Sequence, residues 1–388
     1  MNRLRTTLTR SGIAMLAVVA MAACGDDGSD GTPSTDSTDS PDSPDSPDCG
    51  PAATVPTGGG DAGDTVTLVA YESFPTDAEN PAVAALAAFT ASTGIAVDIL
   101  IAGDTGTMLS KATLTAGNPE GDVMWGVDNS FLSRAISACV FEPYEAAGLA
   151  DLPTEFTGLV PDHHATPVDF GDVCVNYDIA ALEAAGVEPP TSFDDLLKPE
   201  YSGMLVVENP ATSSPGLAFL MGTVAQFGED AWADYWSQLA DNDVLVVDGW
   251  SQAYYEAFSW AGGDRPLVVS YGSSPPFEVL YAAEPLAAAP TGVAEQTCVR
   301  QVEFAGILRG TERLGAAQQL VDFLASPEFQ REVALNLFVF PVHPDVELDQ
   351  AFVDYAAIPE SPLSLDPAVI DARREEWIEE WTRLVPGS

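Results

Sequence analysis

The chain has 388 residues and a formal net charge of −45 at pH 7, from 59 acidic and 14 basic side chains. An apolar fraction of 46% supports a hydrophobic core, and this length suggests two domains or one large one. Such an acidic chain repels nucleic acids and anionic lipid headgroups, because binding to either depends on cationic side chains. We therefore expect no nucleic-acid partner.

Residues 1–24 have the pattern of a signal peptide. Three arginines precede an apolar run, Gly12 to Ala20, that is too short to span a bilayer as a mature helix. Small residues then precede Cys24, as in the bacterial lipobox, where the cysteine is lipidated. An ordinary secretory signal cut nearby is the alternative. We expect an exported lipoprotein, either periplasmic or on the outer face of the cell membrane, that contacts the membrane only through its anchor.

Residues 25–65 are rich in Ser, Thr, Pro, Asp and Gly and contain the repeat SPDSPDSPD. Such a segment cannot bury apolar surface, and its like charges repel one another. We expect a disordered acidic tether between the anchor and a globular body.

Alternating strand and helix patterns begin at Thr65. Strands are expected up to Tyr71 and over residues 95–104 and 121–129, with helices at Asn80–Ser92, Thr105–Ala116 and Ser130–Ala138. This alternation predicts a mostly parallel sheet flanked by helices, with polar strand ends on one edge. The turn at Asp104 and Thr105 opens a helix, so its amides could bind an anion. Helix capping is the alternative role.

A strand at Val173–Asp178 is expected to leave this region for a second one. Further elements are expected at Ile179–Ala185, 192–197 and Gly203–Val207, followed by helices at Ala218–Phe227 and Asp230–Leu239. Ser213 and Ser214 lie directly before the first of these helices. Serine hydroxyls at a helix start suit a phosphate, and simple N-capping is the alternative.

Two later segments place aromatic and hydroxyl side chains at the carboxyl ends of strands. Trp250 follows the apolar run at 244–247, and the strand at 267–271 ends at Tyr271 in a Gly-Ser-Ser-Pro-Pro turn. Ligands of open α/β sheets lie outside such strand ends, so we expect these segments to line one cleft. The adjacent side chains of Tyr254 and Tyr255 could instead ligate a ferric ion. An iron-binding protein is therefore an alternative interpretation of this cleft.

A strand at 297–304 is expected to return to the first region, followed by helices at Leu314–Leu324, Pro327–Leu337 and Ala368–Leu384. The predicted fold is therefore α/β and two-lobed, each lobe a mostly parallel sheet flanked by helices, with a two-strand hinge between the lobes. Lobe 1 comprises residues 66–172 and 299–388, and lobe 2 comprises 173–298. This geometry favours closure around a ligand.

Four cysteines remain besides Cys24, and an exported protein is expected to pair them. Cys174 and Cys298 lie on the two hinge strands, where adjacent antiparallel strands would allow a disulfide. Cys49 and Cys139 are then left as the second pair. Free thiols are the alternative.

No catalytic or metal-binding motif stands out in the sequence. GxSxG, HExxH, GxxxxGK[ST] and CxxC are all missing. We expect a protein that is not an enzyme and has neither cofactor nor metal. The enzyme to consider is a secreted hydrolase of phosphate esters. The lack of a recognisable nucleophile–base pair in the sequence disfavours it.

From about Val66 onward the chain resembles the thiamine-binding proteins of bacterial ABC importers. The segments TSSPGL, DGWSQAY and SYGSSP carry this resemblance, because they occur together in this order, with RQVEF and FVFPVHPDV after them. The resemblance implies the two-lobed, periplasmic-binding-protein-like fold of extracytoplasmic solute-binding proteins. It also implies thiamine or its phosphates as the ligand and ABC permease and ATPase subunits as partners. We further expect a monomer.

The resemblance also assigns roles to residues. It implies that Trp250 packs against the thiamine rings with help from Tyr71 and Tyr271. Four residues are implied to hold the phosphate or hydroxyethyl end of the ligand: Asp104, Thr105, Ser213 and Ser214. Gly272, Ser273 and Ser274 are implied to line the same site. Phe277 and Thr105 depart from enteric members of the family, which have Tyr and Gly there.

Overall fold

The structure, a computed structural model, describes Cys49 and residues 65–385. The expected signal peptide with Cys24, and the expected tether except Cys49 and Thr65, lie outside the described residues. Within the described range, no helix combines the length and apolar character that crossing a membrane requires.

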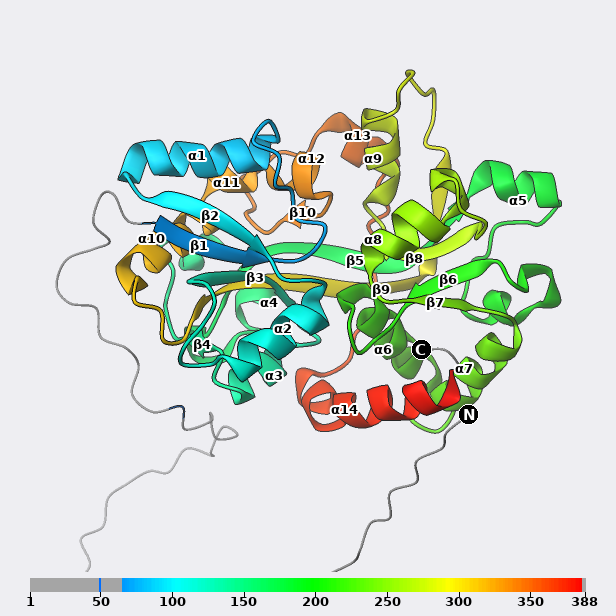
Figure 1. Cartoon of the computed structure of the whole chain (residues 1–388). Helices are drawn as coiled ribbons and strands as arrows, with labels where there is room; N and C mark the ends of the chain where they lie inside the picture. Colours follow the sequence, from blue (N-terminus) through cyan, green and yellow to red (C-terminus); the bar gives the residue numbers. More distant parts are fainter. Residues whose placement is uncertain (1–48, 50–64, 386–388) are drawn as a thin grey trace, which may run out of the picture. The chain divides into compact units, whose positions relative to one another are not determined.

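Lobe 1 begins with three parallel strands and the helices that connect them (Figure 1). They are β1 (Thr65–Ala70), α1 (Pro81–Thr93), β2 (Ala96–Ile101), α2 (Thr105–Leu114), β3 (Val123–Asp128) and α3 (Leu132–Ser137). Helix α1 begins here because Asn80 Oδ1 accepts a hydrogen bond from Ala82 N at 2.9 Å and Pro81 fits the first turn. Gly94 ends it with a φ of 77°, which favours glycine. The predicted order of these elements is confirmed.

Lobe 2 has a second set of three parallel strands, in which β6 lies between β7 and β8. Its elements are α5 (Ile179–Ala185), β6 (Leu205–Glu208), α6 (Ser214–Phe227), α7 (Trp232–Asp241), β7 (Leu245–Val247), α8 (Trp250–Gln252), β8 (Leu267–Tyr271) and α9 (Ser274–Leu280). Helix α6 begins at Ser214, earlier than the predicted Ala218. Pro215 permits this start, because its missing N–H has no partner to lose in a first helical turn.

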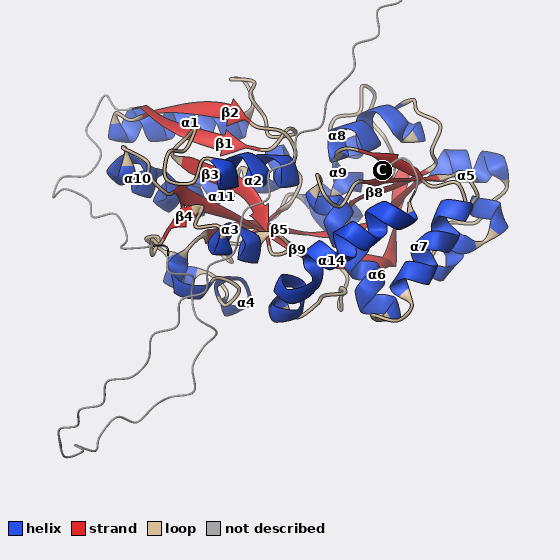
Figure 2. Cartoon of the chain, turned by 60° about the horizontal axis from the view of Figure 1, so that its bottom comes forward, coloured by secondary structure: helices blue, strands red, loops and turns tan. Residues whose placement is uncertain are grey.

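Two long antiparallel strands, β5 (Thr166–Asp178) and β9 (Thr291–Leu308), join the lobes. The strand order is β2-β1-β3-β9-β5-β8-β6-β7, so the lobes share one continuous sheet with parallel strands at both ends. Helices cover both faces of this sheet (Figure 2). The predicted two-lobed α/β fold is confirmed.

Both predicted cysteine pairs are disulfides in the structure. Cys174 and Cys298 join β5 to β9 with their Cα atoms 4.2 Å apart. The strand register shifts at this place, between Val173 and Val175 of β5. Cys49 is bonded to Cys139, just after α3, with a Cα separation of 5.6 Å.

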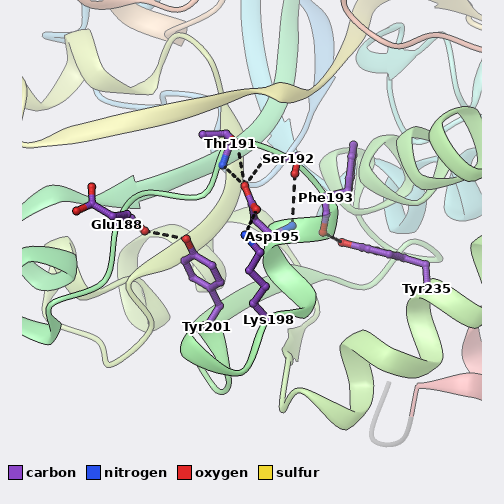
Figure 3. Close-up of polar contacts among 8 residues, drawn as sticks. All are labelled: Glu188, Thr191, Ser192, Phe193, Asp195, Lys198, Tyr201 and Tyr235. Atoms are coloured by element: carbon purple, nitrogen blue, oxygen red, sulfur yellow. Dashed lines mark hydrogen bonds and ion pairs between the residues drawn. The ribbon is translucent and has the colours of Figure 1, made fainter.

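The segment between α5 and β6 is held by side-chain hydrogen bonds around two short 3-10 helices, η3 (Asp194–Leu197) and η4 (Pro199–Tyr201) (Figure 3). Asp195 Oδ2 accepts from Thr191 N and Thr191 Oγ1, both at 2.8 Å, and Lys198 Nζ donates to Asp195 Oδ1 at 2.6 Å. The Tyr235 hydroxyl of α7 donates to Phe193 O at 3.2 Å and so ties the segment to the lobe.

The C-terminal part adds α10 (Leu314–Ala325), α11 (Pro327–Gln330), α12 (Val333–Leu337), β10 (Phe340–Pro341), α13 (Gln350–Tyr355) and α14 (Pro367–Leu384). The single helix predicted at Pro327–Leu337 is therefore wrong. It is split after Gln330, whose buried side-chain amide donates to Val168 O at 2.7 Å and accepts from Val342 N at 2.9 Å. These bonds attach the end of α11 to β5 and to the residue that follows β10.

Helix α14 contacts both lobes, whereas the domain boundaries above placed it in lobe 1 alone. The Trp381 ring meets Trp236 of α7 edge-on, with centroids 5.4 Å apart. On the lobe 1 side, Arg374 Nη1 donates to Ser130 O at 3.1 Å. Two buried indoles on one face of the helix explain this placement, because each needs an apolar partner.

Candidate functional site

A pocket lies beside the hinge strands, where the ends of β1 and β8 meet the first turns of α2, α6 and α8. Its volume is about 830 Å³, open solvent at its mouth included. Both lobes contribute to its wall. The wall residues are Tyr71, Glu72, Ser73, Asp104, Thr105, Ser214, Pro215, Trp250, Ser251, Tyr255, Tyr271, Ser274, Glu303, Asn336, Leu337, Phe338 and Val339.

Trp250 lies in an aromatic cluster on the lobe 2 side of the pocket. Its indole stacks on Tyr254, with centroids 4.9 Å apart and 17° between the planes, and Tyr255 meets it edge-on at 5.3 Å. Indole Nε1 donates to Ser270 Oγ at 2.9 Å, which sets the orientation of the ring. The half-buried indole thus offers an aromatic surface to the pocket, which suits a flat or cationic ligand.

Tyr71 and Tyr271 complete the aromatic wall, and each ring lies over a glycine. A Cβ atom would lie 2.5 Å from Tyr71 Cδ1 if added at Gly126, and 3.1 Å from Tyr271 Cδ1 if added at Gly171. Burial and then the charge of Glu303 raise the pKa of both tyrosine hydroxyls well above the ordinary value. Both side chains are therefore neutral hydrogen-bonding groups at physiological pH.

Asp104 caps α2 and also contacts lobe 2. Its Oδ1 accepts from Thr105 N at 2.7 Å, and its Oδ2 accepts from Trp250 N at 3.1 Å. Close by, Gly106 N donates to Thr212 O at 2.9 Å, again between the lobes. The carboxylate of Asp104 thus occupies backbone donors that a bound anion would otherwise use.

Asp128, at the end of β3, occupies the hydroxyl donor of Ser214 in the same way. It accepts hydrogen bonds from the Ser214 hydroxyl across the lobes, and from Ser130 N at 2.8 Å and Phe131 N at 3.1 Å. Burial nevertheless raises the pKa of this carboxyl above its ordinary value. Two of the donors predicted to hold a phosphate, the Thr105 amide and the Ser214 hydroxyl, are therefore already bonded to carboxyl groups of the protein.

The floor of the pocket is acidic. Glu303 of β9 lies in the wall with 6% of its surface exposed, and Asp169 of β5 is fully buried beside it. The wall residues include three acids and no Lys, Arg or His within the described part of the chain. Such a site favours a cationic ligand and disfavours an anionic one.

The sequence profile of a family described as bacterial extracellular solute-binding protein matches residues 119–359, more than half of the chain. The chain belongs to this family.

Among curated relatives, this solute-binding protein is similar to the thiamine-binding periplasmic protein of Salmonella typhimurium, at 28% identity over 320 residues, covering 82% of this chain and 93% of the relative. The protein of that name from Brucella suis is 26% identical over 326 residues, covering 82% and 92%. Among solved structures, a periplasmic thiamin binding protein matches with a TM-score of 0.73 and 27% identity, covering 83% of this chain and 96% of that one. A ferric binding protein from Campylobacter jejuni shares the fold, with a TM-score of 0.65 and 16% identity, covering 82% and 99%.

Most residues expected to bind ligand in this solute-binding protein lie together in the pocket wall. They are Tyr71, Asp104, Thr105, Ser214, Trp250, Tyr271 and Ser274. Their segments are far apart in sequence, and they meet because each follows a strand or opens a helix at the same edge of the sheet.

Four other expected residues lie behind the wall. Ser213 is fully buried beside Asp104. Gly272 packs on the Ala357 backbone, where an added Cβ would come within 2.5 Å of Ala357 O. Ser273 Oγ donates to Phe338 O at 2.5 Å, and the ring of Phe277 meets that of Phe338 edge-on at 4.5 Å. These two residues position the loop that carries Phe338 into the wall.

Sequence reasoning missed two parts of the wall, Glu303 and residues 336–339, which are the end of α12 and the two residues after it. Glu303 belongs to RQVEF, and Phe338 and Val339 belong to FVFPVHPDV, two segments that carry the family resemblance. Neither part of the wall follows a strand in the pattern used to find the site. A glutamate within an otherwise apolar strand was the available signal for Glu303, because a buried charge needs a reason.

The alternative iron site requires both Tyr254 and Tyr255 as ligands. Tyr254 is 2% exposed, outside the pocket wall, and its hydroxyl donates to the buried carboxyl of Glu278. Tyr255 is 48% exposed and lies in the wall. Burial raises the pKa of both hydroxyls, which opposes the phenolate form that ferric ion binds.

Proposed function

We propose that this chain is the extracytoplasmic substrate-binding component of an ABC importer and that it captures thiamine and delivers it to the permease and ATPase subunits. The observation that carries the proposal is the pocket itself, which combines the Trp250 indole with an acidic floor and has no cationic side chain among its described wall residues. Thiamine consists of two flat rings, one of them a permanently cationic thiazolium. An aromatic face attracts such a cation by about 0.5 to 2 kcal/mol.

In this proposal Trp250, Tyr71 and Tyr271 pack against the rings, while Thr105, Ser214 and Ser274 hydrogen-bond the hydroxyethyl end. The relatives and the solved structure named for thiamine, which align with most of this chain, support the choice of ligand. Asp104 and Asp128 already bond to the donors near Thr105 and Ser214, which supports thiamine over its phosphates.

The proposal includes export and anchoring. A lipid on Cys24 and an acidic tether over residues 25–65 would hold the body outside the membrane as a monomer. Binding and hinge closure need no catalysis and no cofactor. Growth with radiolabelled fatty acid, followed by proteolysis of the purified mature protein, would test the anchor. We expect the label in the N-terminal peptide that begins at Cys24.

Tryptophan fluorescence tests the ligand. We expect micromolar or lower thiamine to quench the emission, and Trp250→Ala to weaken binding by about 30-fold or more, through loss of stacking and cation–π attraction. Trp260→Phe is the matched control, because Trp260 is 40% exposed and lies outside the wall. If neither thiamine nor its phosphates raise the melting temperature while another solute does, the proposed ligand is wrong.

Ferric salt is the second ligand to test. A visible tyrosinate–iron charge-transfer band on titration, lost on Tyr255→Phe, would establish the iron-binding alternative. The bonding of Tyr254 to Glu278 leads us to expect no such band.

A further inference from the structure

Glu303 and Asp169 form a carboxyl pair at the floor of the pocket. They are direct partners in the register of β9 and β5, so their side chains lie next to each other on one face of the sheet. Glu303 is 6% exposed and Asp169 is fully buried. Two ionised carboxylates in such a position repel each other and lack water to screen them.

The hydrogen bonds around the pair leave one oxygen of each carboxyl without a donor. Glu303 Oε1 accepts from Gln301 Nε2 at 3.1 Å, and Asp169 Oδ2 accepts from Trp125 Nε1 at 3.0 Å. Glu303 Oε2 and Asp169 Oδ1 have no donor among the described residues, and as direct strand partners the two carboxyl groups interact with each other and with the Trp125 indole. A single proton between the two groups satisfies both oxygens.

The surroundings favour that proton. The groups that face the pair are Asp128 from β3, Asp104 from the start of α2, and the neutral hydroxyls of Tyr71 and Tyr271. Burial raises the pKa of Asp169 to about 7, against the hydrogen bonds from Trp125 and Glu303. Burial, and then the charges of Asp169 and Asp128, raise the pKa of Glu303 well above its ordinary value.

We propose that Glu303 and Asp169 share one proton in the unliganded protein, that a cationic ligand expels this proton, and that Glu303 thereby determines the selection of a cation. The cation is thiamine if the proposed function holds. The carboxyl O–H bond breaks, the proton passes to solvent, and the charge of the pair changes from −1 to −2 as one positive charge enters the pocket. Glu303 is the member of the pair that lines the pocket, so it is the one that faces the ligand.

This exchange makes binding depend on pH. Where the unliganded pair holds the proton and the complex does not, the affinity falls by about tenfold for each unit decrease in pH. A neutral ligand of the same shape has no reason to expel the proton. Its affinity is therefore independent of pH in this range.

Isothermal titration of thiamine into the full chain at pH 7, in several buffers of different ionisation enthalpy, counts the protons. We expect a net release approaching one proton per thiamine, and none with the neutral aminopyrimidine half of thiamine. Glu303→Gln is expected to weaken thiamine binding on the order of tenfold to a hundredfold and to abolish the release. Asp169→Asn is expected to abolish the release with a smaller loss of affinity, because the new amide donates to Glu303 in place of the proton.

Glu295→Gln is the matched control, because it removes one charge from the exposed part of the same strand. It should leave the proton release intact. Thiamine binding without proton release, or with proton uptake, overturns the inference and leaves the proposed function standing. Failure of the wild-type chain to bind thiamine at all overturns the proposed function instead. Circular dichroism of each variant checks that a loss of binding is not a loss of folding.

Discussion

Asp195 and Glu303 are both acidic side chains with little exposed surface, but their surroundings shift their pKa values in opposite directions. Asp195 accepts hydrogen bonds from Lys198, Thr191 N and Thr191 Oγ1, and these lower its pKa, with the Lys198 bond as the largest cause. Glu303 has an acid as its direct strand partner and one oxygen without a donor, and its pKa is raised.

Asp195 stabilises the fold, whereas Glu303 and Asp169 belong to the binding pocket. Donors around Asp195 compensate its charge, so the ionised form stabilises lobe 2. Around Glu303 and Asp169 no described residue supplies a compensating positive charge, and we infer that the ligand supplies it. A binding site can therefore lower the stability of the unliganded protein in exchange for affinity.

The largest expected effect concerns stability and pH. The folded protein binds a proton at the pair that the unfolded chain releases near pH 4, so the pair lowers the free energy of unfolding as pH rises from about 4 to about 7. A pKa raised to about 7 corresponds to about 4 kcal/mol at most over this range. Urea unfolding of the unliganded protein at several pH values, compared with Glu303→Gln, isolates this contribution. Parallel pH profiles of the two proteins would contradict it.

The next largest effect is discrimination between thiamine and thiamine diphosphate. The pocket wall contains three acids and no Lys, Arg or His within the described residues, and Asp104 and Asp128 occupy nearby donors. We expect thiamine to bind about 100-fold more tightly than the diphosphate, since the phosphates meet like charge. Competition titration with both ligands measures the ratio. Equal affinities would show that other donors accommodate the phosphates.

Asp195→Asn should lower stability and leave binding intact. The amide keeps one acceptor oxygen but loses its charge, so the bonds to Lys198 and to the backbone of Thr191 weaken. By analogy with loss of a helix cap, we expect a decrease of about 1 kcal/mol in the free energy of unfolding at pH 7. The difference should begin to shrink as pH falls below about 4, where the carboxyl of the unfolded chain takes up a proton while that of the folded protein, whose pKa is lowered, is still ionised. Chemical denaturation at pH 7 and pH 3 measures both values.

Lys198→Met should have the smallest effect. The Lys198 side chain is 52% exposed, so water and salt screen its ion pair with Asp195. We expect a smaller loss of stability than for Asp195→Asn, and one that disappears at high salt. A loss as large as that of Asp195→Asn would assign the stabilisation to the ion pair rather than to the backbone donors.

The sequence was sufficient for the order of most elements, the hinge and seven of the seventeen residues in the pocket wall. Helix α1 follows from its Asn80 cap, Pro81 and Gly94, which are local signals. Trp250 and Tyr271 were found because both follow apolar runs, and strand ends of this fold meet at one edge. The family resemblance then supplied the ligand class, which periodicity and spacing alone do not.

Only the tertiary structure decided which residues form the floor of the pocket and what lies behind its wall. The partnership of Glu303 with Asp169 depends on the register of two strands that are far apart in sequence, and no local pattern encodes that register. Local patterns also do not reveal that Ser273 and Phe277 contact Phe338 instead of lining the pocket, because Phe338 is distant from them in sequence. Local residue patterns determine helices, strands and their ends, whereas the burial and pairing of a charge depend on which distant segments pack around it.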